Sequence, residues 1–419
     1  MTGDGPPTVI VAFPSRPPEC WGERLTHAGV RLLQVSACAT LMLAPIEGYL
    51  MAVEPQLVKV PTVLLAASWA GVRLRQRRLP QLHPVHVLLG LLAAVVLTTS
   101  AVHAGEPFTT EYALRWLPFL AVTAILVDVA AREVPLRALL VAAIAGATVA
   151  GVGALFSFFV QGDARATGPL QDPNDLAYVQ VAALPLLLVL IPRGSSHRVR
   201  RAPAVLAPIV ATVLVVGVMA TLSRGGILAL LAVTGWLTVR RVLSVRLLVS
   251  AGALLAVAGV AGMVFAGEYL TRALDEKAYV AASNVDTRAI RWEAAARMLA
   301  DNPLLGVGPG GFRSNYAAAS HNAEIAEQTP VAHNMYLEVA AELGLPGLVL
   351  FLAVIACALV ASERALRASE DPRPMIAIQA GLLGVLVAST FLSEQYYMSL
   401  WSMVAIACAA DLRTRQGAT

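Results

Sequence analysis

The sequence predicts an all-α integral membrane protein with about twelve transmembrane helices and an extracytoplasmic loop with amphipathic helices. Three observations predict this class. Hydrophobic residues make up 57% of the 419 residues and charged residues only 14%, whereas a soluble domain carries about 25% charge. The mean hydropathy is +0.69. The apolar residues also form long runs, and a run of about 20 residues is enough to cross a bilayer as a helix.

These runs divide the chain into expected spans and connecting segments. The organisation that follows is a disordered cytoplasmic tail (1–27), transmembrane helices (28–266), a periplasmic loop (267–332), further transmembrane helices (333–411) and a second cytoplasmic tail (412–419). The first tail lacks the basic start and apolar core of a secretory signal. The expected spans are 28–49, 58–73, 85–103, 113–131, 137–160, 176–192, 202–221, 225–240, 246–266, 334–362, 375–392 and 397–411.

Basic residues gather in alternate connecting segments. The segments at 73–78, 193–201, 240–246 and 364–373 are rich in Arg, whereas the loop at 104–112 has no basic residue. Short loops rich in Lys and Arg stay in the cytoplasm, so we expect both termini to be cytoplasmic in a bacterial inner membrane. The net charge of +4 is spread over these clusters, and this distribution excludes nucleic acid as a partner. Membrane lipid is the expected surrounding.

The cysteines and histidines predict no metal site. Cys20, Cys38, Cys357 and Cys408 lie in the amino-terminal tail or in apolar runs, so neither a disulfide framework nor a Cys-based zinc site is indicated. On the expected outer side, His103, His321 and His333 show no ligand spacing. We therefore expect no metal and no cofactor.

Arg224 follows Ser223 at an outer turn between two expected spans. Ser223 is a suitable cap for the second helix. The positive end of that helix then lies beside Arg224, and an anion between them gains both attractions. The alternative is an interfacial arginine that reaches toward lipid phosphates.

Arg288 and Arg291 lie in a segment that predicts an amphipathic helix on the outer membrane surface. Arg288 lies one turn from both Arg291 and Trp292, so these arginines are candidate ligands for an anion. The alternative is a surface helix whose arginines contact lipid headgroups. Its possible caps are Ser283, Asn284 and Asp286, and its expected apolar face is formed by Ile290, Ala294, Ala295 and Met298.

The glycine-rich segment at 302–312 predicts a turn that returns the chain to the membrane. A nucleotide-binding loop is excluded because Pro309 interrupts the pattern and no strand precedes it. A backbone nest for phosphate is the alternative.

His333 opens the tenth expected span, at the boundary between water and membrane. Histidine suits a general base near neutral pH, so His333 is the candidate catalytic residue. Asn334 is expected to orient it or to bind sugar. Glu338, one turn further, is expected to hold the imidazolium, and its alternative is a helix-packing carboxylate.

The loop at 161–175 adds a further candidate. Arg165 is expected to be a third phosphate ligand, and Asn174 or Asp175 is expected to cap the following span. Outward-facing arginines at a membrane boundary suit a diphosphate attached to a buried lipid, because guanidinium groups bind such oxygens bidentately.

These motifs together resemble the O-antigen ligase and polymerase superfamily, over about residues 28–411. The resemblance rests on Ser223-Arg224-Gly225-Gly226, on Arg288 through Phe312 with Trp292 and Pro303-Leu304-Leu305-Gly306-Val307-Gly308, and on His333-Asn334 followed by Glu338, Glu342 and Gly344. The segment with Arg165, Gly168 and Asp172-Pro173-Asn174 also resembles the family.

The resemblance implies a metal- and ATP-independent, inverting glycosyltransferase on the periplasmic face. It implies an undecaprenyl-diphosphate-linked glycan as donor and lipid A–core oligosaccharide as acceptor, the essential arginines mapping onto Arg224 and Arg288 and the essential histidine onto His333. An O-antigen polymerase or a protein O-oligosaccharyltransferase remains an alternative. A lipid-linked glycan transporter is an alternative of another class, although transporters place charge near the membrane midplane.

Overall fold

The computed structural model describes residues 21–170, 172–191, 201–244, 246, 287–324, 327 and 330–417. In these ranges the helices are joined by turns and loops and there is no strand, as expected for an all-α membrane protein. Outside the described residues lie the expected span at 246–266 except Arg246, most of the expected tail at 1–27, and the cap candidates Ser283, Asn284 and Asp286.

The first half of the chain forms a run of helices joined by short turns. It consists of α1 (Trp21–Leu43), η1 (Ala44–Ile46), α2 (Glu47–Val53), η2 (Pro55–Lys59), α3 (Val60–Gln76), α4 (Pro84–Val102), α5 (Thr109–Arg132), α6 (Leu136–Phe156), the π-helix η3 (Ser157–Gln161) and η4 (Gly168–Leu170). Helix α1 begins at Trp21, inside the segment expected to be a tail, and the apolar stretch within it begins at Ala28.

The second half contributes α7 (Pro173–Ala183), η5 (Leu184–Leu190), α8 (Arg201–Ala220), α9 (Arg224–Val239), α11 (Gly311–Ala319), α12 (Met335–Ala368), α13 (Arg373–Ala388) and α14 (Met398–Gly417). A further helix covers residues 287–301. The expected span at 176–192 is divided between α7 and η5 because Pro185 cannot donate a helical hydrogen bond.

Seven of the described helices are long and apolar enough to cross a bilayer. Three shorter apolar helices match further expected spans, namely Leu206–Ala220, Arg224–Val239 and Arg373–Ala388. The expected total of about twelve spans stays a prediction.

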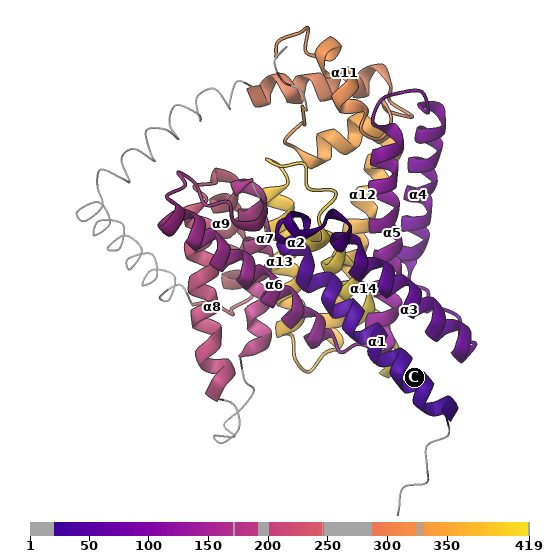
Figure 1. The fold of residues 1–419 in the computed structure, drawn as a ribbon, viewed down its shortest axis with the longest axis vertical. Helices are drawn as coiled ribbons and strands as arrows, with labels where there is room; N and C mark the ends of the chain where they lie inside the picture. Colours follow the sequence, from indigo (N-terminus) through magenta and orange to yellow (C-terminus); the bar gives the residue numbers. More distant parts are fainter. Residues whose placement is uncertain are drawn as a thin grey trace, which may run out of the picture.

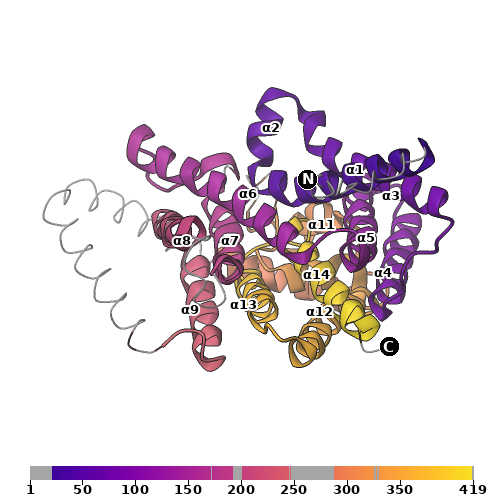
Figure 2. The same ribbon diagram turned by 90° about the horizontal axis from the view of Figure 1, so that it is seen from below.

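The helices form one bundle with α13 and α14 near its middle. Helix α14 packs against α5 and α12, and α13 packs against α9; Figure 2 shows α8 and α9 at one side of them and α3, α4 and α5 at the other. Trp116, Phe351 and Trp401 from three of these helices meet edge to face in the core, with ring centroids 6.1–6.2 Å apart. Such contacts lock neighbouring helices together.

A small layer covers one end of the bundle. It contains α11 and lies at the top of Figure 1, beside the ends of α4, α5 and α12. The C-terminus lies at the opposite end. A second hydrophobic cluster fills this layer, formed by Ala294, Ala295, Met298, Val307, Phe312, Tyr316, Ala332 and Ala341. The layer therefore has its own core, and the candidate residues Arg288, Arg291 and His333 belong to the segments around it.

Candidate functional site

Arg224 is the first residue of α9 and is exposed. Ser223 caps the helix, its Oγ accepting a hydrogen bond of 3.2 Å from Gly226 N, which confirms the expected cap. Within the described ranges, the Arg224 guanidinium makes no hydrogen bond or ion pair. It therefore adds an uncompensated cation to the positive end of the helix, the arrangement that favours a bound anion.

Arg165 fixes the preceding loop beside this turn. Its Nε donates to Thr221 O at 2.9 Å, and its Nη2 donates to Asn174 Oδ1 at 3.1 Å. Burial lowers the pKa of Arg165, and the negative charge of Asp172 opposes this effect. Arg165 thus joins the end of α8 to the start of α7, and part of its guanidinium is already used in that task.

The N-cap of α7 is Asp172. The prediction that Asn174 or Asp175 caps this helix is wrong. Asp172 Oδ1 accepts hydrogen bonds from Asn174 N at 2.7 Å and from Asn174 Nδ2 at 3.0 Å. The signal was present, because Asp directly before Pro173 is a typical helix start.

Arg288 lies on the helix at 287–301, with its guanidinium carbon 6.0 Å from the ring centroid of Phe391. Burial lowers the pKa of Arg288; Asp172 opposes this, and the charges of Arg165, Arg291 and Arg224 lower it further. Four arginines from three separate segments therefore share one electrostatic neighbourhood. Among the described residues no acidic side chain pairs with Arg288, so its hydrogen-bonding groups are available to a ligand.

Arg291 differs from Arg288 in having carboxylate partners. Its Nε and Nη2 donate to Glu324 at 3.0 and 2.9 Å, and Nη2 also donates to Glu327 at 3.0 Å. The residue is only 7% exposed. Arg291 therefore ties the helix at 287–301 to the segment before His333. Although it is paired, its charge still lowers the pKa of Arg288 and of His333.

His333 lies between that segment and α12 in the left-handed backbone region, with φ 49°. Burial lowers the pKa of His333 to about 4, and the charges of Arg291 and Arg288 contribute to this decrease; Asp172 and Glu327 oppose it. The imidazole is therefore neutral at pH 7, the form that accepts a proton.

Asn334 and Glu338 hold the backbone on either side of His333. Asn334 caps α12, its Oδ1 accepting from Tyr336 N and Leu337 N, both at 3.1 Å. Glu338 is 1% exposed and accepts a hydrogen bond of 2.9 Å from Ala332 N. Its carboxylate also accepts hydrogen bonds from Ser393 and Gln395 and forms an ion pair with Arg313, whose Nη1 lies 3.8 Å away. In the described part of the chain Glu338 forms no hydrogen bond with His333, so its carboxylate positions the loop and does not touch the imidazole.

The glycine-rich segment docks on a break in α12. Gly344 has φ 67° and ψ −174° and interrupts the helix, and Val307 N and Gly308 N donate to the freed carbonyls of Ala341 and Glu342 at 2.9 and 3.0 Å. This supports the interpretation as a turn. The alternative of a phosphate nest is wrong for these two N–H groups, because backbone acceptors already occupy them.

The helix at 287–301 has the expected apolar face, but protein covers it. Ala294, Ala295 and Met298 are buried in the second hydrophobic cluster with Phe312 and Tyr316. The expectation that this face lies in the membrane surface is therefore wrong for these residues. The segment at 302–319 folds back over these side chains, so protein and not lipid covers the apolar face.

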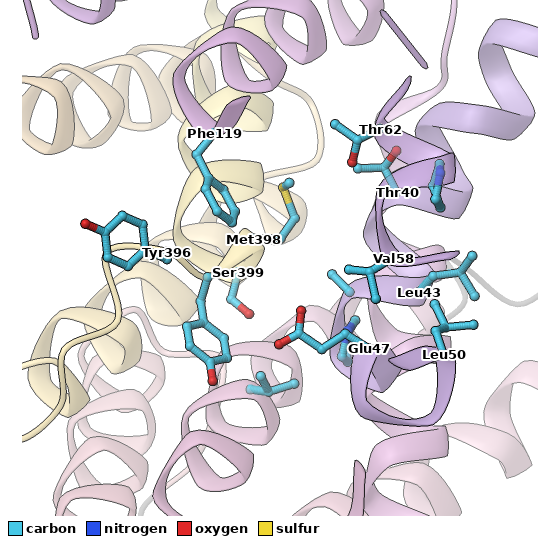
Figure 3. Close-up of a pocket in the computed structure, with 15 residues that line it drawn as sticks. Thr40, Leu43, Glu47, Leu50, Val58, Thr62, Phe119, Tyr396, Met398 and Ser399 are labelled. Atoms are coloured by element: carbon cyan, nitrogen blue, oxygen red, sulfur yellow. The ribbon is translucent and has the colours of Figure 1, made fainter. Parts of the chain in front are cut away.

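A cavity of about 90 Å³ lies between α1–α3 and the segment at 396–399, and Phe119 and Val179 also line it. Figure 3 shows the Glu47 carboxylate reaching into it. Tyr397 lines the cavity, and its hydroxyl donates to Asp175, next to Asn174. Glu47 lines it and no arginine or histidine does, so the cavity disfavours an anionic ligand.

The structure thus brings Arg165, Arg224, Arg288, Arg291 and His333 into one region, with Asn334 and Glu338 beside it. Sequence reasoning missed the roles of Asp172, Glu324, Glu327 and Phe391. Only Asp172 had a local signal, since the other three depend on contacts between distant segments.

Comparison with known proteins gives one family. Residues 209–352 match the family model described as O-antigen ligase. The match includes Arg224, Arg288 and His333, whereas Arg165 precedes it. No curated protein matches the chain.

Proposed function

We propose that this chain, a member of the O-antigen ligase superfamily, transfers a glycan from undecaprenyl diphosphate to lipid A–core oligosaccharide. The proposal places the reaction at the periplasmic face of the bacterial inner membrane. The proposal rests on one observation. Arg224 and Arg288, which have no acidic partner in the described chain, lie in the same region as His333, whose imidazole is neutral.

In this proposal Arg224 and Arg288 bind the diphosphate of the donor. Arg288 lies on a helix of the layer that covers one end of the bundle, and the charge of Arg224 acts on it, so a lipid tail can remain among the helices while its headgroup reaches both arginines. Guanidinium groups bind phosphate oxygens in pairs and stabilise the negative charge that develops on the leaving group. Arg165 and Arg291 add positive potential, although part of each guanidinium is used in structural contacts.

His333 acts as the general base. It takes the proton from an acceptor hydroxyl, whose oxygen attacks the anomeric carbon from the face opposite the diphosphate. The new glycosidic bond forms as the bond to phosphate oxygen breaks, and undecaprenyl diphosphate leaves with that electron pair. The configuration inverts. The activated donor supplies the driving force, so the proposed reaction needs no ATP, and the two arginines take the charge-stabilising role that a metal ion would otherwise have.

The charge distribution favours an enzyme over a lipid-linked glycan transporter. The candidate residues gather at one end of the bundle, whereas secondary transporters place their binding sites near the membrane midplane. The same motifs fit a polymerase or a protein O-oligosaccharyltransferase. These enzymes differ from a ligase in the acceptor, so the experiment must identify the molecule that receives the glycan.

The test is a transfer assay with purified protein, undecaprenyl-diphosphate-linked glycan and lipid A–core, in chelator and without ATP. We expect glycan on lipid A–core with the wild type. We expect the rate to fall by about 10²–10⁴ in His333→Asn, as for removal of a general base. Asn is chosen because it tolerates the left-handed backbone at φ 49° better than Ala.

Matched variants separate chemistry from folding. His321→Asn is the control for His333, since His321 also has a positive φ, 55°, and is exposed. Arg224→Lys and Arg288→Lys should each lower the rate about 10- to 100-fold, the loss of one charge-assisted hydrogen bond of about 1.5–3 kcal/mol. Arg297→Lys, on the helix of Arg288 but paired with Glu293, should retain the wild-type rate.

Each product points to one acceptor class. Longer lipid-linked glycan in place of modified lipid A–core would make the chain a polymerase. Full activity of both Arg→Lys variants would overturn the diphosphate assignment, and full activity of His333→Asn would overturn the general base.

A further inference from the structure

We propose that His83, Cys357 and Cys408 bind a thiophilic divalent metal ion of the Zn²⁺ class, at a site separate from the arginines. One ring nitrogen of His83 and the two Sγ atoms all lie within 4.8 Å of one another. The three residues come from three elements, since His83 precedes α4, Cys357 is on α12 and Cys408 is on α14. Their meeting does not depend on the proposed glycosyl transfer.

The cluster lies at the far end of α4 from the candidate site. His83 caps the start of this helix, which has 19 residues, and His103 follows its end. His103 lies against the glycine-rich segment, because a Cβ added to Gly308 would be 2.9 Å from His103 Cβ. At 1.5 Å per residue the two ends of α4 are about 28 Å apart.

The side chains have the chemistry of a metal site. Two thiolates and an imidazole are a ligand set that Zn²⁺ prefers. His83 is 3% exposed and Cys408 is fully buried, and Cys357 is half-buried. Water therefore competes little for the ligand atoms once an ion is bound.

Charge balance favours a divalent ion. Binding converts two thiols to thiolates and releases two protons to solvent, so a dication gives a neutral buried site, which avoids the cost of an isolated buried charge. A monovalent ion would leave a net negative charge. The neighbouring Asp411 adds none, because its Oδ2 is already paired with Arg415 Nη2 at 2.5 Å.

Asp411 also orients the histidine. Its Oδ2 lies 3.1 Å from His83 Nε2. The other ring nitrogen, Nδ1, accepts a hydrogen bond of 3.2 Å from Val85 N at the start of α4, and a metal ion bound at Nδ1 would replace this bond. A carboxylate hydrogen-bonded to an imidazole is the usual second partner of a metal-binding histidine and fixes the orientation of the ring. Three protein ligands leave the fourth position of a tetrahedral ion to water.

The experiment uses Co²⁺ as a probe for Zn²⁺ in the full, reduced and chelator-stripped protein in detergent. We expect one ion per chain and a thiolate-to-metal charge-transfer band that Zn²⁺ abolishes by displacement. Cys357→Ser and Cys408→Ser should lose the band and weaken binding at least about 100-fold, more than loss of a second partner. Cys38→Ser, a half-buried cysteine of α1 outside the cluster, is the matched control and should bind as the wild type does.

A second measurement guards against variants that fail to fold. In the wild type, Zn²⁺ should protect Cys357 and Cys408 from alkylation and leave the reactivity of Cys38 unchanged. Absence of a charge-transfer band in the wild type, equal loss of the band in Cys38→Ser, or alkylation unaffected by Zn²⁺ would each overturn the site. A Cys357–Cys408 disulfide in protein kept under reductant would also overturn it.

Discussion

His333 combines an unusual backbone with a shifted titration. A non-glycine residue at φ 49° costs of the order of 1–3 kcal/mol. Hydrogen bonds on both sides hold this conformation, from Ala332 N to Glu338 and from Met335 N to Ser389 O. Glu338 belongs to α12, and Ser389 is the C-cap of α13. The bundle therefore fixes the backbone position from which the imidazole projects.

The lowered pKa of His333 gives a prediction at the residue scale. Because its pKa is about 4 in the folded chain and 6.5 normally, the neutral base persists until the pH falls well below 6.5. We expect kcat/KM, which reports the free enzyme, to lose activity on an acid limb near pH 4. An acid limb centred at 6.5 or above would contradict this environment for His333.

The same shift has a defined sign for stability. The folded state binds the proton less readily than the unfolded state, so the contribution of His333 is fully present above pH 6.5 and is lost as the pH falls through about 4. The rate measurements must therefore be paired with a check that the chain is still folded at each pH.

At the scale of elements, α12 is the helix that joins the site to the bundle. Asn334 caps it, Glu338 lies in its first turn, and the segment at 303–308 packs on its break at Gly344. The sequence predicted a helix at 334–362 and missed the break, although Pro346 was a visible signal. It also predicted the turn at 302–312, but its docking on α12 depends on residues more than thirty positions away.

Gly344→Ala tests the importance of this break. The new Cβ would lie 2.7 Å from Leu304 C and O, at a residue with φ 67°. We expect a loss of about 1–3 kcal/mol from the backbone alone, seen as a lower Tm in detergent, together with reduced transfer. Gly71→Ala in α3, where a Cβ meets nothing within 4 Å, should leave Tm nearly unchanged. Equal Tm values for the two variants would mean that the docked segment does not need the glycine.

At the scale of the whole molecule, charge is divided between the two ends of the bundle. At the end remote from α11, Arg73 pairs with Asp128 and Glu133 at 2.6 Å each, and Arg413 donates to the carbonyls of Ala130 and Val134. The alternation of basic segments could be predicted from the sequence. The partners were not, because pairs such as Arg73 with Glu133 form only when separate helices pack.

Labelling with a membrane-impermeant maleimide tests the orientation. Gly105→Cys lies in the loop between α4 and α5, beside the glycine-rich segment, and Glu370→Cys lies between α12 and α13; both positions are exposed. By the positive-inside rule, intact spheroplasts should label residue 105 and not residue 370. Wild type controls for the native cysteines. Labelling at 370 alone would reverse the proposed orientation.

The break in α12 also has a consequence for how the chain is made. Residues 303–308 leave the ribosome before Gly344 does, and until then the N–H groups of Val307 and Gly308 have no native acceptors. Arg224 of α9 and Arg288, the residues proposed to bind the donor, are likewise synthesised before His333. The layer that contains α11 therefore reaches its final form only after α12 has been inserted, and a nascent chain that stops short of this helix presents these arginines without His333.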